Sequence, residues 1–175
     1  MRYYSTTRRI AGVDEAGRGP LAGPVVAAAV VLDPLSYDGM GIHDSKKLSA
    51  RKREKLSEVI RQNALSISVC AVGPRRIEAM NIREATKWAM SYVASRVQAD
   101  HVLVDGNMRI NLEFPSHETC IKGDGTFIEI AAASIIAKVT RDRMMKLVDL
   151  HYPLYGFTSH QGYPTAAHRL SLIHI

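Results

Sequence analysis

The sequence has only two cysteines among its 175 residues, Cys70 and Cys120. Both stand in apolar, strand-like stretches, and their spacing matches no metal-binding pattern. A secreted fold built on disulfides is therefore disfavoured. We expect two buried free thiols in a reducing, cytoplasmic protein.

Long apolar runs are also absent, since the longest covers only residues 25–32 and is far too short to span a bilayer. Residues 1–9 carry charge, and no apolar signal-peptide core follows them. We therefore expect no membrane contact. The sequence also lacks a P-loop, a dinucleotide-binding glycine motif and a serine nucleophile elbow, which disfavours the chemistry that each of them supports.

Acidic residues are outnumbered, with 17 Asp and Glu against 23 Lys and Arg, giving a net charge of +6. This excess suits a polyanionic partner, although a soluble protein that is merely basic would show the same balance. The placement of the charges favours a nucleic-acid partner, because the basic residues cluster while the acidic residues follow apolar stretches. A hydrophobic content of 46% is enough for one core, so we expect residues 1–175 to form a single domain.

The apolar pattern alternates between strand and helix periods, which is typical of an α/β fold. Ser49 and Asn81 are suited to cap the starts of two helices. Strands are expected over 10–14, 24–32, 65–72, 101–105 and 119–122, and helices over about 50–63, from 82 onward, and over about 126–150.

An acidic pair, Asp14-Glu15, follows the apolar residues 10–13 at the end of the first predicted strand and precedes Gly17-Arg18-Gly19. Adjacent strand residues face opposite sides of a sheet, so the pair can meet one site only where the strand ends. Carboxylates there are hard ligands for a divalent cation. The Gly-Arg-Gly segment can bring backbone N–H groups and a guanidinium close to an anion or a sugar edge. The segment therefore predicts a metal and phosphate site.

Two further predicted strands end in acid beside glycine, at Asp105-Gly106 and at Gly123-Asp124-Gly125. Each alone is more commonly an ordinary turn. If the three strands share a sheet, however, their ends converge, and the clustered carboxylates need cations to stay ionised. Two Mg²⁺ or Mn²⁺ ions would satisfy them and support two-metal hydrolysis of a phosphodiester.

Lys46 and Lys47 follow a short polar turn, where they either grip a phosphate or belong to a solvated helix cap. The residues alone leave both interpretations open. Tyr163 stands between glycine and proline and is the best aromatic candidate for stacking on a sugar or base. The residues His151, His160 and His168 show no zinc spacing and are expected to be surface or capping histidines.

Taken together, these motifs resemble the bacterial ribonuclease HII family. The blocks that carry the resemblance are VDEAGRGPLAGP at 13–24, DSKKLS at 44–49, Asn81-Ile82 with Ala85-Thr86, VDG at 104–106, KGD at 122–124, AAASIIAKVTRDR at 131–143 and HQGYPT at 160–165. They occur in the family's order and span most of the chain.

The resemblance implies a ribonuclease H-like α/β fold, with a mixed central sheet flanked by helices and a shortened helical C-terminal part. It implies metal-dependent endonucleolytic cleavage of the RNA strand in RNA–DNA hybrids, including single ribonucleotides embedded in duplex DNA. The expected products carry 5′-phosphate and 3′-hydroxyl ends. The expected cofactor is Mg²⁺ or Mn²⁺, with two ions when substrate is bound, and the expected role is ribonucleotide excision repair in the cytoplasm without an obligate protein partner.

The resemblance also assigns roles to single residues. The metal-binding acids would be Asp14, Glu15 and Asp105, with Asp124 as the fourth active-site acid. Gly17, Arg18 and Gly19 would contact the ribonucleotide 2′-hydroxyl and adjacent phosphates, Tyr163 would stack at the junction, and Lys46 and Lys47 would hold backbone phosphate. Asp142 lies in a matching block but is expected to be a helix-surface or salt-bridging residue.

The chain departs from the family pattern at three places, of which the variable segment Gly125-Thr126-Phe127 implies little. Gln161 replaces a frequent lysine, which removes one expected phosphate contact. Residues 170–175 do not match the family's usual basic continuation, so we expect a truncated or atypical end after about residue 168. A protein that binds hybrids with little turnover is therefore the alternative. Ribonuclease HIII is disfavoured, because that family carries an additional N-terminal domain.

Overall fold

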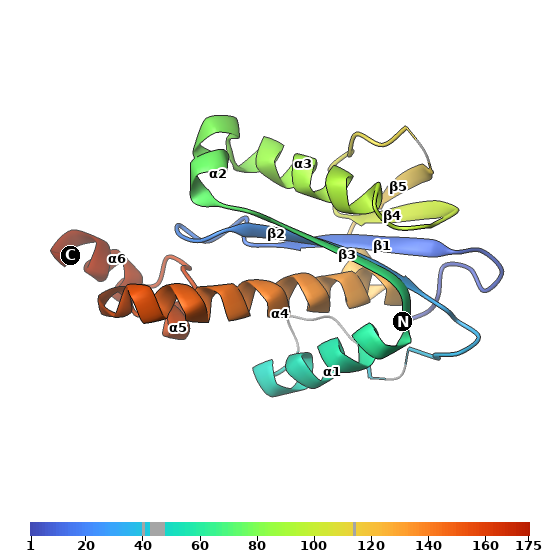
Figure 1. Cartoon of the computed structure of the whole chain (residues 1–175), viewed down its shortest axis with the longest axis horizontal. Coiled ribbons are helices and arrows are strands. Elements are labelled where there is room, and N and C mark those ends of the chain that lie inside the picture. The colour runs from blue at the N-terminus through green and yellow to red at the C-terminus, as the bar shows by residue number, and fades with distance from the viewer. Residues whose placement is uncertain (40, 43–47, 114) are drawn as a thin grey trace.

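The computed structural model describes residues 1–39, 41–42, 48–113 and 115–175, and a five-stranded sheet in the order β3-β2-β1-β4-β5 forms its centre (Figure 1). β2 is antiparallel to both β1 and β3, whereas β1, β4 and β5 run parallel to one another. The sheet is therefore mixed. The strands are β1 Ile10–Ala16, β2 Val25–Leu32, β3 Ala64–Val72, β4 His101–Asp105 and β5 Ser116–Cys120.

Helices cover both faces of this sheet, as Figure 1 shows. α2 and α3 lie on one face, α1 and α4 lie on the other, and α4 extends past the sheet to reach α5 and α6. The helices are α1 Ala50–Asn63, α2 Pro74–Met80, α3 Ile82–Ala94, α4 Ile128–His151, α5 Phe157–His160 and α6 Ala166–His174.

Two apolar cores follow from this layering. β2 is buried along its whole length, as its unbroken Val/Ala sequence predicts. Alternate β2 residues face opposite cores: Ala27 packs toward α3 with Val93, whereas Ala28 packs toward α4 with Ile135. The sheet is thus shielded on both faces, and its edges remain for function.

The predicted helix starts are confirmed. The Ser49 side chain accepts a hydrogen bond from the Lys52 N–H, and Asn81 accepts one from the Glu84 N–H. α4 is buried over residues 128–137 because it packs against both β1 and β2. α2 was not expected from the sequence, whereas α5 and α6 form the helical C-terminal part that the resemblance implied. α2 has no buried residue, so it carries no apolar stripe that would reveal it.

The parallel arrangement brings the ends of β1, β4 and β5 to one edge of the sheet. Pairing of β1 with β4 stops at Val13 and Val104, whereas pairing with β2 continues to Ala16. Asp14 and Glu15 therefore lie within β1, not after it. The expectation that the strand ends at Asp14 was wrong. β1 no longer pairs with β4 beyond Val13, and this leaves the edge of the sheet open at the two acids. None of the described helices is long and apolar enough to cross a membrane.

Candidate active site

Three carboxylates meet at the shared edge of β1, β4 and β5. Asp14 comes from β1, Asp105 is the last residue of β4, and Asp124 lies in a 3-10 turn after β5. Each offers one oxygen, and the three oxygens lie within 4.8 Å of one another. The Asp124 N–H also donates to Asp105 Oδ1 at 3.2 Å. The predicted convergence of these acids is confirmed, and we call them the carboxylate cluster.

Glu15 follows Asp14 on β1 and is not one of the three acids whose oxygens meet. Its carboxylate forms an ion pair with Arg18 at 3.5 Å. Glu15 also lines a cavity that opens beside the carboxylate cluster. This cavity has a volume of about 230 Å³. Its lining residues are Asp14, Glu15, Ala16, Gly17, Arg18, Gly19, Arg53, Asp105, Ser134, Lys138 and Tyr163.

The electrostatics of the cluster favour a bound cation. Asp14 is only 5% exposed. Burial, followed by the charges of Glu15 and Asp105, raises its pKa well above the usual range, against an opposing hydrogen bond from Ser134. A divalent cation would offset this repulsion, and an all-carboxylate donor set suits a hard ion such as Mg²⁺ or Mn²⁺. The residues present therefore fit such an ion.

The glycines beside the cluster differ in what the fold demands of them. Gly17 has φ +110°, and a Cβ there would lie 2.4 Å from the Pro24 oxygen and 2.6 Å from Arg141 Nε. The fold therefore requires glycine at this position. A Cβ on Gly19 would meet only Tyr163 Cε1, at 3.7 Å, which is an ordinary contact. Nothing in the described fold requires glycine at position 19.

Arg141 ties the loop after β1 to the segment before Tyr163. Its buried guanidinium donates to three backbone oxygens, those of Pro24 at 3.0 Å, Gln161 at 2.9 Å and Ala22 at 3.0 Å. We call this set of contacts the Arg141 junction. It fixes two chain segments that are distant in sequence on either side of one side chain.

Tyr163 is held from behind by the C-terminal segment. Its carbonyl accepts a hydrogen bond from His168 Nδ1 at 3.0 Å, and the rings of His160 and His168 stack with centroids 4.4 Å apart. Both histidines are buried, so the expectation of a surface position was wrong for these two, whereas His151 is exposed as expected. The Tyr163 side of the cavity stays accessible, with the residue 41% exposed and the Lys138 ammonium 5.6 Å from its ring centroid.

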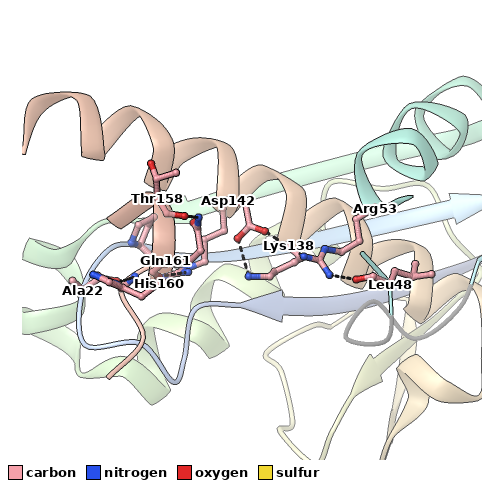
Figure 2. A network of polar contacts seen from close by, with 11 residues as sticks. Ala22, Leu48, Arg53, Lys138, Asp142, Thr158, His160 and Gln161 are labelled. Carbon is pink, nitrogen blue, oxygen red and sulfur yellow. Dashed lines mark hydrogen bonds and ion pairs between the residues drawn. The ribbon is translucent and has the colours of Figure 1, made fainter. Parts of the chain in front are cut away.

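Three polar residues of the cavity were missed in the sequence: Ser134, Lys138 and Arg53. The spacing of four between Ser134 and Lys138 places both on one face of α4, and this was the available signal. Asp142 extends that face and forms ion pairs with Lys138 at 2.7 Å and Arg53 at 3.9 Å (Figure 2). The salt-bridging role predicted for Asp142 is confirmed.

Arg53 was grouped in the sequence with a solvated basic face of α1. Its neighbours Arg51, Lys52 and Lys55 are exposed as expected, but the Arg53 side chain is only 14% exposed. Lys46 and Lys47, the predicted phosphate ligands, lie outside the described residues. The other predicted site residues all fall at the carboxylate cluster or along the cavity beside it.

A mixed sheet with helices on both faces is the ribonuclease H-like α/β architecture, and solved structures share it. The structure of ribonuclease HII from Archaeoglobus fulgidus in complex with PCNA matches with a TM-score of 0.81 and 31% identity, over 95% of this chain and 87% of that chain. Ribonuclease H2 from Pyrococcus horikoshii matches with a TM-score of 0.77 and 29% identity, over 90% and 82% of the two chains.

Sequence relatives narrow the class to one family. The family model described as Ribonuclease HII matches residues 11–175. Ribonuclease HII of Dechloromonas aromatica is 51% identical over 165 residues, which cover 93% of this chain and 83% of that protein. The corresponding protein of Syntrophotalea carbinolica is 49% identical over 167 residues, covering 94% and 79%. The chain therefore belongs to the ribonuclease HII family.

Membership makes the chain a ribonuclease H-type endonuclease, an enzyme that cleaves the RNA strand of RNA–DNA hybrids. The family is metal-dependent, and the carboxylate cluster is suited to hold the metal. The edge of the sheet described above is thus the candidate active site, and we call the cavity beside it the catalytic cavity.

Proposed function

We propose that the chain cleaves at single ribonucleotides embedded in duplex DNA as well as within continuous hybrids, leaving 5′-phosphate and 3′-hydroxyl ends. The observation that carries this proposal is the shared cavity: two acids of the carboxylate cluster, Asp14 and Asp105, line it together with Gly19 and Tyr163. Cutting chemistry and a possible reader of the sugar thus adjoin each other.

The carboxylate cluster together with Glu15 would hold two Mg²⁺ or Mn²⁺ ions. Such ions supply an activated water and stabilise the leaving oxygen of a phosphodiester. Lys138 and Arg53 bring positive charge to the same cavity, where a scissile phosphate would lie. Asp142 holds the side chains of Lys138 and Arg53 in place through its two ion pairs.

Recognition of the ribose is assigned to Gly17, Arg18, Gly19 and Tyr163. The missing side chain at Gly19 has no explanation in the fold, so we assign it to close approach of the substrate sugar. The 2′-hydroxyl is the group that distinguishes RNA from DNA at a single position. The exposed Tyr163 ring would stack at the junction between ribonucleotide and deoxyribonucleotide.

The direct test is cleavage of a duplex that carries one ribonucleotide, in the presence of Mg²⁺ or Mn²⁺. We expect one cut, with a 5′-phosphate that a ligase accepts. An all-DNA duplex of the same sequence should remain intact. Binding without cleavage in both metals would reject the proposal and favour the hybrid-binding alternative.

Gly19→Ala tests the recognition part separately. Because the added methyl group meets only an ordinary contact in the free protein, the variant should fold normally. It should lose cleavage at single ribonucleotides more than it loses binding to plain duplex DNA. Gly17→Ala is the contrasting variant, since its methyl group clashes with the backbone and it should lower stability as well. Equal losses on both substrates for Gly19→Ala would show that Gly19 does not read the sugar.

We also propose that Lys46 and Lys47 hold backbone phosphate, on the strength of the sequence resemblance. Replacing both with Gln should reduce the slope of log affinity against log salt concentration by about two units, since each phosphate contact contributes about 0.9 to that slope. We further propose that the chain acts as a single domain in the cytoplasm, in the removal of ribonucleotides from DNA. The low cysteine content suits a reducing compartment. Cys70 and Cys120 are free, but they are half-buried and not fully buried as expected.

A further inference from the structure

A second cavity adjoins the catalytic cavity on the side of α3. It has a volume of about 360 Å³ and shares Arg18 with the catalytic cavity. Its other lining residues come from the first half of α3 and from the segment that follows Asp105. They are Arg83, Glu84, Lys87, Asn107, Met108 and Arg109, and we call the cavity the α3 groove.

The α3 groove is strongly basic, with four cationic side chains lining it against the single carboxylate of Glu84. Arg83 and Arg109 are exposed and Lys87 is half-buried. Within the part of the chain that the structure describes, these three form no ion pair within 4.0 Å, whereas the Arg143 guanidinium is paired with Glu54. Cations that outnumber their counter-charges repel one another, and a polyanion would relieve that repulsion.

The walls of the groove are fixed by the fold. The Asn111 N–H donates to Ser91 Oγ at 2.9 Å, which ties the segment after β4 to α3. The Gly106 N–H donates to the Cys120 oxygen at 3.0 Å, which anchors the start of that segment to β5. The basic side chains therefore project from held backbone that leads directly away from Asp105.

We propose that the α3 groove binds the phosphodiester backbone of the duplex beside the cleavage site. The proposal rests on the function proposed above. Duplex DNA carries one charge per about 1.7 Å of its axis. A duplex seated in the catalytic cavity must therefore lay further phosphates along the protein surface. Arg18 joins the two cavities, so a strand leaving the carboxylate cluster past Arg18 enters the α3 groove.

A neighbouring cavity of about 400 Å³ shares Glu84 and Lys87 with the α3 groove and includes Trp88 and Tyr92. These two rings stack on each other with centroids 5.4 Å apart, and Arg76 covers Trp88 at 3.8 Å. Their faces are engaged within the protein, as expected for packing. We therefore assign binding to the basic part of the groove and not to an aromatic stacking platform.

The test removes the three cations while keeping their side-chain stems, in the variant Arg83→Gln/Lys87→Gln/Arg109→Gln. Binding to a plain DNA duplex is measured over a range of NaCl concentrations without divalent metal, so that nothing is cleaved. At about 0.9 units per phosphate contact, the slope of log affinity against log salt should fall by about two to three units. At low salt the affinity should fall at least about tenfold.

The matched control is Arg9→Gln/Arg61→Gln/Arg96→Gln, which removes the same charge. These three exposed arginines lie near the opposite edge of the sheet, where β1 and β4 begin. Their loss should change the slope by less than about one unit. The conservative variant Arg83→Lys/Arg109→Lys keeps the charge and should keep the wild-type slope, and thermal melts should show that all three proteins fold.

A groove variant with the slope and affinity of the control would overturn the proposal and leave the groove to another anion, such as an acidic peptide. The cleavage assay separates this failure from failure of the proposed function. The wild-type protein either cuts or does not cut, whatever the groove binds. In a cutting enzyme, the groove variant should raise KM more than it lowers kcat, since its residues lie outside the carboxylate cluster.

Discussion

The carboxylate cluster and the Arg141 junction each bury a charged side chain, but they satisfy that charge to different degrees. Asp14 is buried beside like charges, which raises its pKa. Arg141 is buried among three carbonyl oxygens, each at hydrogen-bond distance. The first arrangement stores repulsion that a cation releases, and the second stores none. Buried charge thus marks chemistry in one region and architecture in the other.

The largest expected effect comes from Asp14→Asn. Removing one metal ligand should lower cleavage on the order of 10³-fold, because a bound ion contributes several kcal/mol of transition-state stabilisation. Without metal the variant should be at least as stable as the wild type, since it relieves repulsion from Glu15 and Asp105. Activity assays and urea melts check both parts.

Asp100→Asn is the control for this change, because Asp100 is exposed at the opposite edge of the sheet. It should leave cleavage within a few-fold of the wild type. A marked loss of stability in Asp14→Asn would place Asp14 with Arg141 among structural residues and would break the comparison.

Arg141→Lys should have the opposite signature. An ammonium group cannot reproduce the planar fork that reaches three carbonyls, so at least one buried oxygen loses its partner. We expect the free energy of unfolding to fall by about 2–5 kcal/mol. Recognition of a single ribonucleotide should weaken as well, because the junction supports both Gly17 and the segment before Tyr163.

Arg143→Lys, two residues along α4, provides the matched control. Its guanidinium pairs with Glu54 at an exposed site, where such pairs contribute less than about 1 kcal/mol. If the two lysine variants had equal stability, the three hydrogen bonds of the Arg141 junction would not stabilise the fold.

Glu129 separates burial from like charge in this comparison. It is 1% exposed and accepts a hydrogen bond from the Tyr4 N–H at 3.0 Å. Burial raises its pKa from 4.5 to about 7. The folded protein therefore keeps this proton after the unfolded chain has lost it. The stabilising contribution is complete below pH 4.5 and is lost as the pH rises to about 7, a change of about 3 kcal/mol.

Glu129→Gln should remove this part of the pH dependence, because the amide stays neutral and can still accept from Tyr4. The variant should be more stable than the wild type at pH 8, as denaturant melts at several pH values would show. Parallel pH profiles for the two proteins would mean that the side chain does not titrate in this range.

The smallest effect is expected for Asp142→Asn. Its side chain and those of its partners Lys138 and Arg53 are 18%, 22% and 14% exposed, so solvent screens the two ion pairs only in part. We expect a loss of about 1 kcal/mol in the free energy of unfolding, near the upper end for an exposed pair. Duplex binding should tighten slightly at low salt because the cavity gains net positive charge. A loss above 2 kcal/mol, measured by urea melt, would rank Asp142 with the fully buried charges.

The sequence predicted Asp14 and Asp105 well because each ends an apolar run that had to be a strand. The strand before Asp124 was predicted over 119–122 but spans Ser116–Cys120, because its polar sequence has no apolar run to mark its start. Parallel order then brought the acids of β1, β4 and the turn after β5 to one edge. It did not predict that β1 continues through Glu15, since that depends on which neighbour remains paired. Pairing is a property of the sheet and is not encoded in the local pattern.

The missed residues share a tertiary origin. Arg53 reads as part of a basic helix face until α4 packs beside it and Asp142 draws it inward. The burial of His160 and His168 arises from packing within the C-terminal segment, as their stacked rings show. α2 was missed because none of its residues is fully buried, although proline at its first position was an available signal.

Close contact at the Arg141 junction limits how the recognition loop can be exchanged. A Cβ at position 17 would strike Arg141, and a Cβ at position 162 would lie 2.4 Å from the Ala22 oxygen. Substitutions at these three positions should therefore be strongly non-additive. A loop grafted from a relative will therefore keep this packing only if Gly17, Arg141 and Gly162 are transferred together.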